Sequence, residues 1–490
     1  MALGDWHGEG PAYLALARAT AQLVVNAKLP VGSRLPPERE LATSLNLSRT
    51  TISAAYDALR HHGYLVSKRG AGSWTALPTA SPGGVVSSGA RWVDRLDTLD
   101  SFGAPDAVVP LDLTLAAPAA GAGADQVARA AEHAVAELPR YVANHGYDSF
   151  GLPQLREAIA HRYERRGLPT NPDQILVTSG AQHAIDLVQQ VLVRPGERVI
   201  VESPTYPRAL DAVVAHSARP VAVDIDGTGW TAAVVDAFLA TLRQAAPSLT
   251  YLIADFHNPT GSSMSEEIRG QVAAAVARAG SYAVVDETLV DLALDVELAE
   301  SPLPSLQPLA SYDGADRLIS VGSLSKSVWG GLRLGWIRAD TRLVQRLAIA
   351  RSRLDIAGPV LEQLIGVNLL ASYDDIVLGR RAELRERRDE LIAAIRKALP
   401  AWGFEVPAGG LSLWVELDRP VSGALVASAA REGVRLAPGS RFGNDSRFER
   451  RLRLPFTLPV DSLLEAVRRL AVADGRVREG EPVALADMIV

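Results

Sequence analysis

Short apolar runs recur throughout residues 109–476, and each is followed at once by small or polar residues. Helical patterns of apolar residues separate the runs, so we expect strands that alternate with helices. Runs that are apolar throughout indicate strands buried on both faces, as in a mostly parallel sheet covered by helices on either side. The sequence therefore predicts an α/β body in this range. Its predicted strands lie in QILVTSG, RVIVESP, TYLIADF, YAVVDET and RLISVGS.

The length of the chain, 490 residues, exceeds what one hydrophobic core usually organises, so we expect more than one domain. The chain lacks an apolar run of roughly 18 residues, which a membrane helix needs. Its N-terminus has no secretory signal, so we expect a cytoplasmic protein. Cysteine is absent and the nine histidines follow no metal-ligand spacing. Disulfides and thiol chemistry are therefore excluded, and no metal site is expected.

Composition and charge predict four parts. We expect a head in residues 1–78, a flexible linker rich in Ser, Gly, Pro and Asp in 79–108, the body in 109–476, and a tail without an assigned role in 477–490. The head has eight Lys and Arg residues against five Asp and Glu, a net charge of +3, whereas the remainder carries −9. A basic head on an acidic body suggests nucleic-acid binding, although a basic face alone is more often merely solvated.

The pattern of the head is more specific than its charge. LPPERELATSLNLSRTTISAAYDALRHHGYL predicts two short helices joined by a tight turn, the first beginning at Pro36 and Pro37 and the second capped by Ser48. The second helix has an apolar stripe at helical spacing, which we expect to be buried: Ile52, Ala55, Tyr56 and Leu59. The side chains at its N-terminal end face outward, as in a recognition helix that enters the major groove: Arg49, Thr50, Thr51 and Ser53.

Beyond this helix, YLVSKRGAGSWTAL predicts two strands around a Gly-Ala-Gly tip, which suits a wing that touches the DNA backbone through Lys68 and Arg69. The whole stretch GSRLPPERELATSLNLSRTTISAAYDALRHHGYLVSKRGAGSW resembles the winged helix-turn-helix of GntR-type transcription regulators. The resemblance implies DNA contacts from this set of residues: Arg34, Arg39, Ser48, Arg49, Thr51, Gly70 and Gly72. The family usually has a serine where this chain has Pro37, which implies the loss of one phosphate contact.

Chemically useful side chains follow the predicted strands of the body directly. Ser179-Gly180-Ala181-Gln182 opens a helix after QILVT, where free backbone N–H groups and a hydroxyl suit a phosphate. Asn258 in HNPTG offers an amide, Asp286 a carboxylate and Lys326 an amine. Ligands of such sheets bind in the loops after the strands, so we expect these groups to meet.

These groups match the needs of pyridoxal 5'-phosphate, namely a lysine for a Schiff base, a carboxylate for the pyridine nitrogen and a phosphate cup. Arg333, Ser323 and Ser325 lie near Lys326 in the sequence and add phosphate donors. Each residue alone has an ordinary explanation, such as a solvated lysine or a turn-forming aspartate. Their order, each directly after a strand, favours the cofactor site.

The body resembles the fold-type I pyridoxal-phosphate-dependent aminotransferases, most closely in SLSKSVWGGLRLGW. The resemblance implies a smaller C-terminal α/β subdomain beside the large sheet. It also implies that Lys326 carries the cofactor as an internal aldimine, that Asp286 pairs with the pyridine nitrogen and that Asn258 binds the ring hydroxyl. The residues assigned to the phosphate are Ser179, Gly180, Ala181, Gln182, Ser323, Ser325 and Arg333.

Three further motifs carry roles by the same resemblance. ESPTYPRAL implies that Tyr206 stacks on the ring, and HGYDSFGLPQLREAIA implies that Tyr147 reaches the phosphate of the partner subunit. RLRLPF points to Arg453 as the clamp of an effector carboxylate, with an ordinary surface arginine as the competing interpretation. The resemblance fails after Asp286, because aminotransferases commonly place a tyrosine a few residues on, where this chain reads Glu-Thr-Leu. In that family the hydroxyl of this tyrosine bonds the ring oxygen of the cofactor, so the resemblance does not imply the same catalytic tuning here.

A GntR-type head joined to an aminotransferase-like body is the arrangement of the MocR/GabR-type transcription regulators, which this chain resembles from end to end. The resemblance implies a pyridoxal-phosphate-dependent regulator that binds double-stranded DNA at operator half-sites as a head-to-tail homodimer. Its effector would be pyridoxal phosphate itself, an amino acid or an amino sulfonate. Two alternatives remain: an active aminotransferase with an accessory DNA-binding head, and a regulator whose body has lost its cofactor and serves for dimerisation only.

Overall fold

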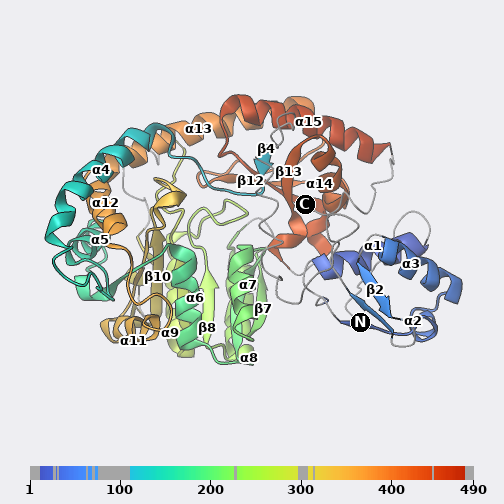
Figure 1. The fold of residues 1–490 in the computed structure, drawn as a ribbon, viewed down its shortest axis with the longest axis horizontal. Helices are drawn as coiled ribbons and strands as arrows, with labels where there is room; N and C mark the ends of the chain where they lie inside the picture. The colour runs from blue at the N-terminus through green and yellow to red at the C-terminus, as the bar shows by residue number, and fades with distance from the viewer. Residues whose placement is uncertain are drawn as a thin grey trace. The chain divides into compact units, whose positions relative to one another are not determined.

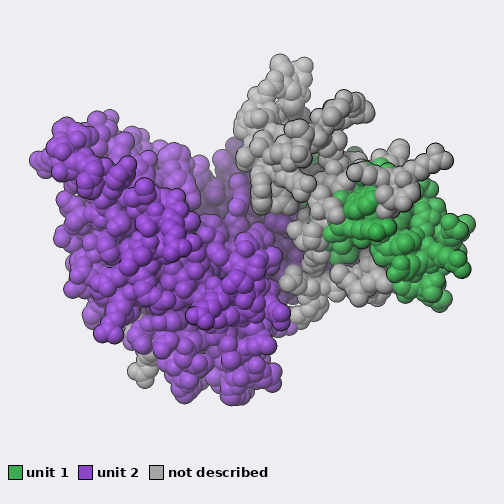
Figure 2. Space-filling view, turned by 60° about the horizontal axis from the view of Figure 1, so that its bottom comes forward, with its two compact units in different colours: residues 1–110, 424–433, 474–490 green, residues 111–423, 434–473 purple. Residues whose placement is uncertain are grey.

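The structure, a computed structural model, describes residues 12–25, 29, 33–61, 64–68, 72–75, 111–225, 229–295, 307–312, 315–443 and 446–479. The chain divides into two compact units, which Figure 2 colours separately: residues 1–110, 424–433 and 474–490, and residues 111–423 and 434–473. The predicted linker at 79–108, Arg69 and Gly70 of the wing, and residues 480–490 of the tail lie outside the described residues.

The described part of the head contains three helices and a small antiparallel sheet. The helices are α1 (Ala12–Val25), which we did not predict, α2 (Glu38–Leu45) and α3 (Arg49–His61). The sheet has the order β1-β3-β2 and consists of β1 (Arg34–Leu35), β2 (Leu65–Lys68) and β3 (Gly72–Thr75). All four residues of the predicted α3 stripe are buried, in one core with Leu16 and Ala17 of α1. The helix-turn-helix and its wing are thus confirmed.

A seven-stranded, mostly parallel sheet forms the centre of the body, in the order β5-β11-β10-β9-β8-β6-β7. Five strands confirm the predicted runs: β5 (Ile175–Thr178), β6 (Arg198–Ser203), β8 (Leu249–Leu252), β9 (Tyr282–Asp286) and β10 (Leu318–Ser323). Two more, β7 (Arg219–Asp224) and β11 (Gly335–Arg338), complete the sheet. Because β11 runs antiparallel to both its neighbours while the other pairs are parallel, the carboxyl ends of the five predicted strands meet at one edge.

Helices cover both faces of this sheet, because successive strand residues enter two different hydrophobic cores (Figure 1). In β9, Ala283 and Val285 enter one core and Val284 enters the other. The first core is shared by α5 (Pro153–Arg165), α8 (Ala232–Ala245), α9 (Glu266–Ala279) and α12 (Val360–Ala371). The second is shared by α6 (Ala181–Leu192), α7 (Pro207–Ala215) and α11 (Thr341–Arg351).

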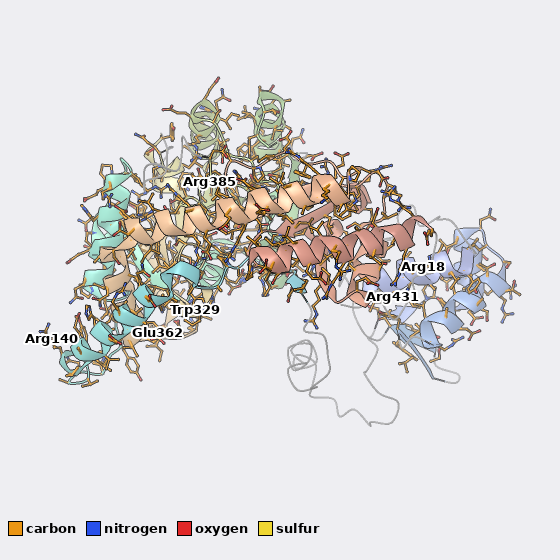
Figure 3. The ribbon with its side chains drawn as sticks, turned by 90° about the horizontal axis from the view of Figure 1, so that it is seen from above. Arg18, Arg140, Trp329, Glu362, Arg385 and Arg431 are labelled. Carbon is orange, nitrogen blue, oxygen red and sulfur yellow. The ribbon has the colours of Figure 1, made fainter. Side chains whose placement is uncertain are left out.

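A second sheet of four strands has the order β12-β14-β13-β4 and provides the expected smaller subdomain. Its strands are β4 (Leu111–Leu113), β12 (Ser412–Glu416), β13 (Val434–Pro438) and β14 (Arg451–Pro455). The other α-helices in the described part of the body are α4 (Ala124–Glu137), α13 (Tyr373–Ala398), α14 (Ser422–Arg431) and α15 (Val460–Arg478). Figure 3 shows α13, which carries Arg385, as one continuous helix. Among the described residues, no helix combines the length and the apolar character needed to cross a membrane.

Candidate cofactor site and DNA-contacting residues

Lys326 lies in the loop that follows β10, and its side chain is half-buried. Its Nζ donates a hydrogen bond to the carbonyl oxygen of Ala116 at 2.7 Å. Burial, together with the positive charge of Arg453, lowers the pKa of the Lys326 amine from 10.5 to about 8, while Asp286 opposes the shift. The neutral amine is the form that attacks an aldehyde, so this environment favours the nucleophilic form of Lys326.

Asp286 ends β9, the strand beside β10, and is only 6% exposed. Both of its carboxylate oxygens accept hydrogen bonds. Oδ2 accepts from the hydroxyl of Tyr251 at 2.6 Å, and Oδ1 accepts from the backbone N–H and the hydroxyl of Thr288 at 2.9 and 2.6 Å. Thr288 therefore binds the carboxylate in a stretch where the family resemblance implies a phenol. Tyr251, which we did not predict, approaches the carboxylate from β8 instead.

The predicted phosphate cup lies where α6 begins. Gly180 precedes the helix with a φ of +84°, and a Cβ there would lie 2.7 Å from Nη2 of Arg333, so only glycine fits. Nη2 of Arg333 donates to the carbonyl oxygen of Ser179 at 3.0 Å. The guanidinium thus approaches the first turn of α6, whose N–H groups have no partner within the helix. In that turn, Oε1 of Gln182 is buried without a hydrogen-bond partner among the described residues.

The two predicted serines before Lys326 contact one another at the end of β10. Oγ of Ser323 lies 2.9 Å from Oγ of Ser325 and 2.8 Å from the carbonyl oxygen of Leu334. The backbone N–H of Ser325 also donates to Oγ of Ser323 at 3.1 Å. These bonds hold the loop that presents Lys326 and place both hydroxyls together.

Arg453 on β14 is only 6% exposed, which contradicts the interpretation as an ordinary surface arginine. Its Nη1 donates to Oδ1 of Asn258 at 3.3 Å, and its Nη2 donates to the carbonyl oxygen of Thr114. Its Nε is buried and has no hydrogen-bond partner among the described residues. Burial lowers the pKa of Arg453 from 12.5 to about 10, so the guanidinium stays charged at neutral pH and can bind an anion.

The two predicted tyrosines differ in their surroundings. Tyr206 immediately precedes α7 and is half-buried; burial raises the pKa of its phenol, and the charges of Arg208 and Asp286 also act on it. Tyr206 therefore lies near enough to Asp286 and Arg453 for their charges to act on its phenol. Tyr147 is 65% exposed, and its ring lies 5.7 Å from that of His145 between centroids. The structure does not bring Tyr147 together with the other predicted residues of its own chain.

A backbone segment that we did not predict contacts both cations of the site. We name residues 114–120 the strap. The carbonyl oxygen of Ala116 accepts from Lys326, and that of Thr114 accepts from Arg453. Backbone carbonyls are alike at every residue, so no sequence pattern indicates this contact.

The far end of the strap is tied to the lysine loop by Arg380 of α13, which is buried. Its Nη2 lies 2.7 Å from the carbonyl oxygen of Ala119, and 2.8 Å from those of Ala120 and Val328. Nη1 of Arg380 pairs with Glu383 at 2.7 Å. One guanidinium thus holds together two segments that lie more than two hundred residues apart in the sequence.

In the head, the predicted DNA-contacting residues are exposed arginines, two hydroxyl residues at the start of α3 and the glycines of the wing. Arg34, Arg39 and Arg49 are exposed, at β1, in α2 and at the start of α3. Ser48 caps α3 as predicted, because its Oγ accepts the N–H of Thr51 at 3.0 Å and also lies 2.7 Å from the hydroxyl of Thr51. Gly72 begins β3, and Gly70 lies outside the described residues.

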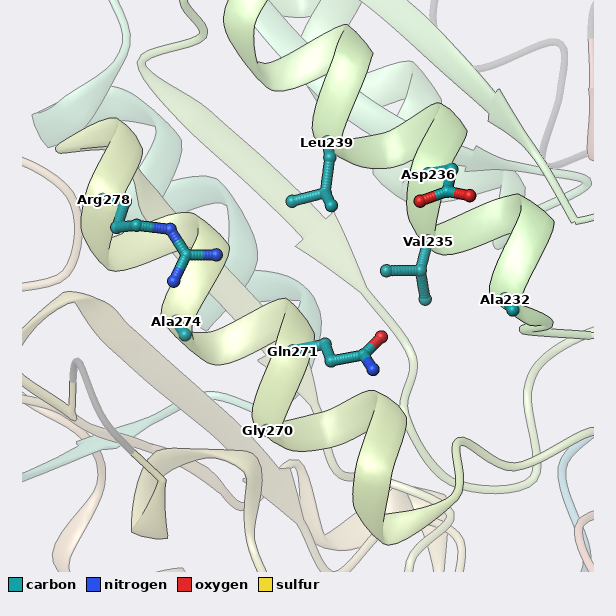
Figure 4. Close-up of a pocket in the computed structure, with 8 residues that line it drawn as sticks. All are labelled: Ala232, Val235, Asp236, Leu239, Gly270, Gln271, Ala274 and Arg278. Carbon is teal, nitrogen blue, oxygen red and sulfur yellow. The ribbon is translucent and has the colours of Figure 1, made fainter.

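A separate groove of about 520 Å³ lies between α8 and α9 (Figure 4). Its lining mixes apolar and polar side chains and includes none of the predicted site residues: Ala232, Val235, Asp236, Leu239, Gly270, Gln271, Ala274 and Arg278. The groove is therefore distinct from the lysine site.

The donor set at the ends of the strands fits pyridoxal phosphate. The amine of Lys326 has a lowered pKa, Asp286 presents a carboxylate, and Gly180 lets Arg333 approach the start of α6. Residues 113–470 match the family described as aminotransferase class I and II. The chain belongs to this family. Residues 12–74 of this aminotransferase-family chain match a second family, the gntR family of bacterial regulatory proteins.

Individual relatives reflect both parts of the chain. YisV of Bacillus subtilis, named as an uncharacterised helix-turn-helix-type transcriptional regulator, is 26% identical over 96% of this chain and 100% of its own length. The 2-aminoadipate transaminase of Thermus thermophilus is 32% identical over 66% of this chain and 79% of its own. The crystal structure of LysN, the α-aminoadipate aminotransferase of the same organism complexed with N-(5'-phosphopyridoxyl)-L-leucine, has a TM-score of 0.68 and 29% identity, and covers 76% of this chain and 93% of its own.

These matches confirm the two-part organisation and assign pyridoxal phosphate as the cofactor of this aminotransferase-family chain. When bound, this cofactor supplies an aldehyde that reacts reversibly with amines and a pyridine ring that withdraws electrons. The GntR-family head supports DNA binding. Together they support a pyridoxal-phosphate-dependent DNA-binding regulator.

Proposed function

We propose that the chain is a transcription regulator that holds pyridoxal phosphate as an aldimine at Lys326 and senses an amine, or the cofactor itself. One observation carries the proposal: a lysine of lowered pKa, a buried carboxylate and a buried arginine lie together in a chain that also has a GntR-family head. A relative that matches nearly the whole chain is named as a transcriptional regulator, which supports the same function.

The residues of the site divide the work of holding the cofactor. Lys326 supplies the amine, Asp286 pairs with the pyridine nitrogen, and Asn258 donates to the ring hydroxyl. Tyr206 packs on the ring. The phosphate is bound at the start of α6 and by the loop after β10, through Ser179, Gly180, Ala181, Gln182, Ser323, Ser325 and Arg333. These contacts to the ring and the phosphate make the site specific for this cofactor over simple aldehydes.

Arg453 selects the class of effector. Its guanidinium is buried and charged, and its Nε has no partner among the described residues, so an anionic group on the ligand gains charge-assisted hydrogen bonds there. Lys326 presents the reacting amine in the same site, because it lies close enough to Arg453 for that charge to lower its pKa. The effector class that this pair favours is an amine with a carboxylate or a sulfonate.

Binding of such an effector competes with the strap. A carboxylate is a stronger acceptor for a guanidinium than a neutral carbonyl oxygen is, so it displaces Thr114 from Arg453. Attachment of the cofactor to Lys326 would by itself remove the donor that holds Ala116. The strap follows β4 directly, and β4 follows the predicted linker along the chain. Occupancy of the site thus alters the segment that leads to the head. The ligand binds more tightly to the state in which the strap is released than to the state in which Arg453 holds it, and this difference in affinity shifts the balance between the two states.

Two copies of the chain act together in this proposal, in a head-to-tail homodimer. The exposure of Tyr147 supports its predicted role at the phosphate of the partner subunit. Two heads then present Arg34, Arg39 and Arg49 to paired half-sites on double-stranded DNA. The functional parts of each chain are the head at 1–78, the linker at 79–108, the body at 109–476 and the tail at 477–490.

A second candidate function is turnover as an aminotransferase with an accessory head. The same three residues, Lys326, Asp286 and Arg453, favour it, and so does the similarity to a 2-aminoadipate transaminase. The absence of a phenol in the residues that follow Asp286 opposes it. Thr288, which lies in this stretch, binds the carboxylate of Asp286.

The visible absorption spectrum of the full chain separates the two functions. We expect a cofactor band that is lost in Lys326→Ala and kept in Lys397→Ala, which replaces an exposed lysine of α13. A shift of this band with one anionic amine, accompanied by changed DNA binding and no product, supports the regulator. Conversion to the pyridoxamine form and recovery with a keto acid at a steady rate supports the enzyme and contradicts the sensor.

A further inference from the structure

Tyr251 connects the two central strands of the site. It lies on β8 opposite Val284 of β9, so it shares a face with Asp286, two residues further along β9. Its side chain is 1% exposed, and its hydroxyl donates to Oδ2 of Asp286 at 2.6 Å. Neither the family resemblance nor the strand pattern singled out this residue.

Among the described residues, the hydrogen bonds to Asp286 leave one acceptor position of its carboxylate free. A carboxylate has about four such positions, two on each oxygen. Thr288 occupies both on Oδ1 through its N–H and its hydroxyl, and Tyr251 occupies one on Oδ2. The remaining position is therefore on the same oxygen that Tyr251 binds, and its direction depends on that bond.

We propose that Tyr251 is a positioning residue for the cofactor: its hydroxyl fixes Asp286 so that the free position of Oδ2 points at the pyridine nitrogen. This inference rests on the proposed role of Asp286. Burial, and then the negative charge of Asp286, raise the pKa of the Tyr251 phenol well above 10, so the group remains a donor throughout the pH range of function. Tyr251 is thus a phenol of the site that binds the carboxylate of Asp286 from the neighbouring strand β8.

The test compares two cofactors in the full-length apoprotein: pyridoxal phosphate and its 1-deaza analogue, which has carbon in place of the ring nitrogen. The variant is Tyr251→Phe, which keeps the ring and its packing. We expect the dissociation constant for pyridoxal phosphate to rise about tenfold, as for the loss of one hydrogen bond to a charged group. The constant for the deaza analogue is expected to stay the same, because no nitrogen is present to be positioned.

Tyr163→Phe is the matched control, since Tyr163 is a buried phenol of α5 that contacts Trp336 at 3.2 Å. It is expected to change neither constant. Equal weakening of both cofactors in Tyr251→Phe would show a purely structural role and contradict the inference, as would unchanged binding of both. If the unmodified chain itself does not distinguish the two cofactors, the role of Asp286 is wrong and the inference falls with it.

Discussion

Nη1 of Arg453 donates a hydrogen bond to Oδ1 of Asn258 at 3.3 Å, across 195 residues of sequence. The bond occupies the amide oxygen of Asn258 and fixes the orientation of the amide, so that its NH2 group is available for the predicted contact with the ring hydroxyl of the cofactor. The residue proposed to clamp the effector and the residue proposed to bind the cofactor are therefore linked by a hydrogen bond. A ligand that draws Arg453 toward its own anionic group alters how Asn258 is held.

Replacement of Arg453 by lysine tests the clamp. Arg453→Lys keeps the charge but loses the planar fork, so we expect affinity for an anionic amine to fall about 10- to 100-fold, as for one or two charge-assisted bonds. Retention of pyridoxal phosphate should change much less. Spectral titration of the holoprotein with amino acids and amino sulfonates measures both quantities. Arg450→Lys, at an exposed neighbour that donates to the carbonyl oxygen of Asp418, serves as the control. Equal losses in the two variants would contradict the clamp.

The lowered pKa of Lys326 predicts a pH profile for cofactor attachment. In the apoprotein, the attachment rate follows the neutral amine, so it should rise about tenfold per pH unit below pH 8 and level off above it. Because Arg453 lowers the pKa of Lys326, Arg453→Gln should move the plateau to higher pH. Stopped-flow absorbance measures the rate. A profile that keeps rising to pH 10 in the unmodified chain would show an ordinary, solvated lysine.

The same shift affects the stability of the apoprotein. An unfolded lysine ionises near pH 10.5, whereas Lys326 in the folded chain does so near 8. Between these values the unfolded chain binds the additional proton, so the contribution of this group to the free energy of unfolding increases as the pH rises. Lys326→Met should abolish that increase, which urea denaturation at a series of pH values can measure.

Much of the fold was predictable because two physical signals are local. Continuous apolar runs correctly located β5, β6, β8, β9 and β10. Apolar residues at helical spacing correctly identified the buried face of α3. The side chains directly after those strands, among them Asp286 and Lys326, came together because parallel strands end at one edge of the sheet.

The missed features depend on contacts between residues distant in sequence. Tyr251 lies in an apolar run, and its position there does not distinguish it from an ordinary buried aromatic residue. Its proposed role follows only from its hydrogen bond to Asp286 on the neighbouring strand. Arg166 and Glu287 form a buried ion pair at 2.7 Å, although they lie 121 residues apart. The local sequence around each residue does not indicate its partner. β11 was missed because its four residues directly follow the glycine-rich loop after Lys326. Pairing of this kind is set by tertiary packing.

Two neighbouring residues at the start of α3 have different predicted roles: Arg49 contacts DNA, and Ser48 caps the helix. Arg49→Ala removes an exposed cation, so DNA binding should weaken for all sequences and the slope of its salt dependence should fall by about one. Ser48→Ala removes the oxygen that accepts the N–H of Thr51 and caps α3, so it should lower the free energy of unfolding of the head by about 1 kcal/mol. Arg60→Ala, at the other end of α3 and paired with Asp57, is the control. Fluorescence anisotropy at several salt concentrations is the measurement. An unchanged salt slope in Arg49→Ala would exclude a phosphate contact.

The strap provides the most direct test of how the site signals. Lys326 and Arg453 hold Ala116 and Thr114 only while their own donors are free for the carbonyls. An anionic amine added to the holoprotein should therefore increase amide hydrogen exchange in residues 114–120 by about tenfold, because its anionic group takes the Arg453 guanidinium from the carbonyl oxygen of Thr114. β12 in the same chain should be unaffected. In Lys326→Ala the strap should exchange faster before any ligand is added. Slower exchange on ligand binding would mean that the strap closes over the ligand, and the proposed direction of the switch would be wrong.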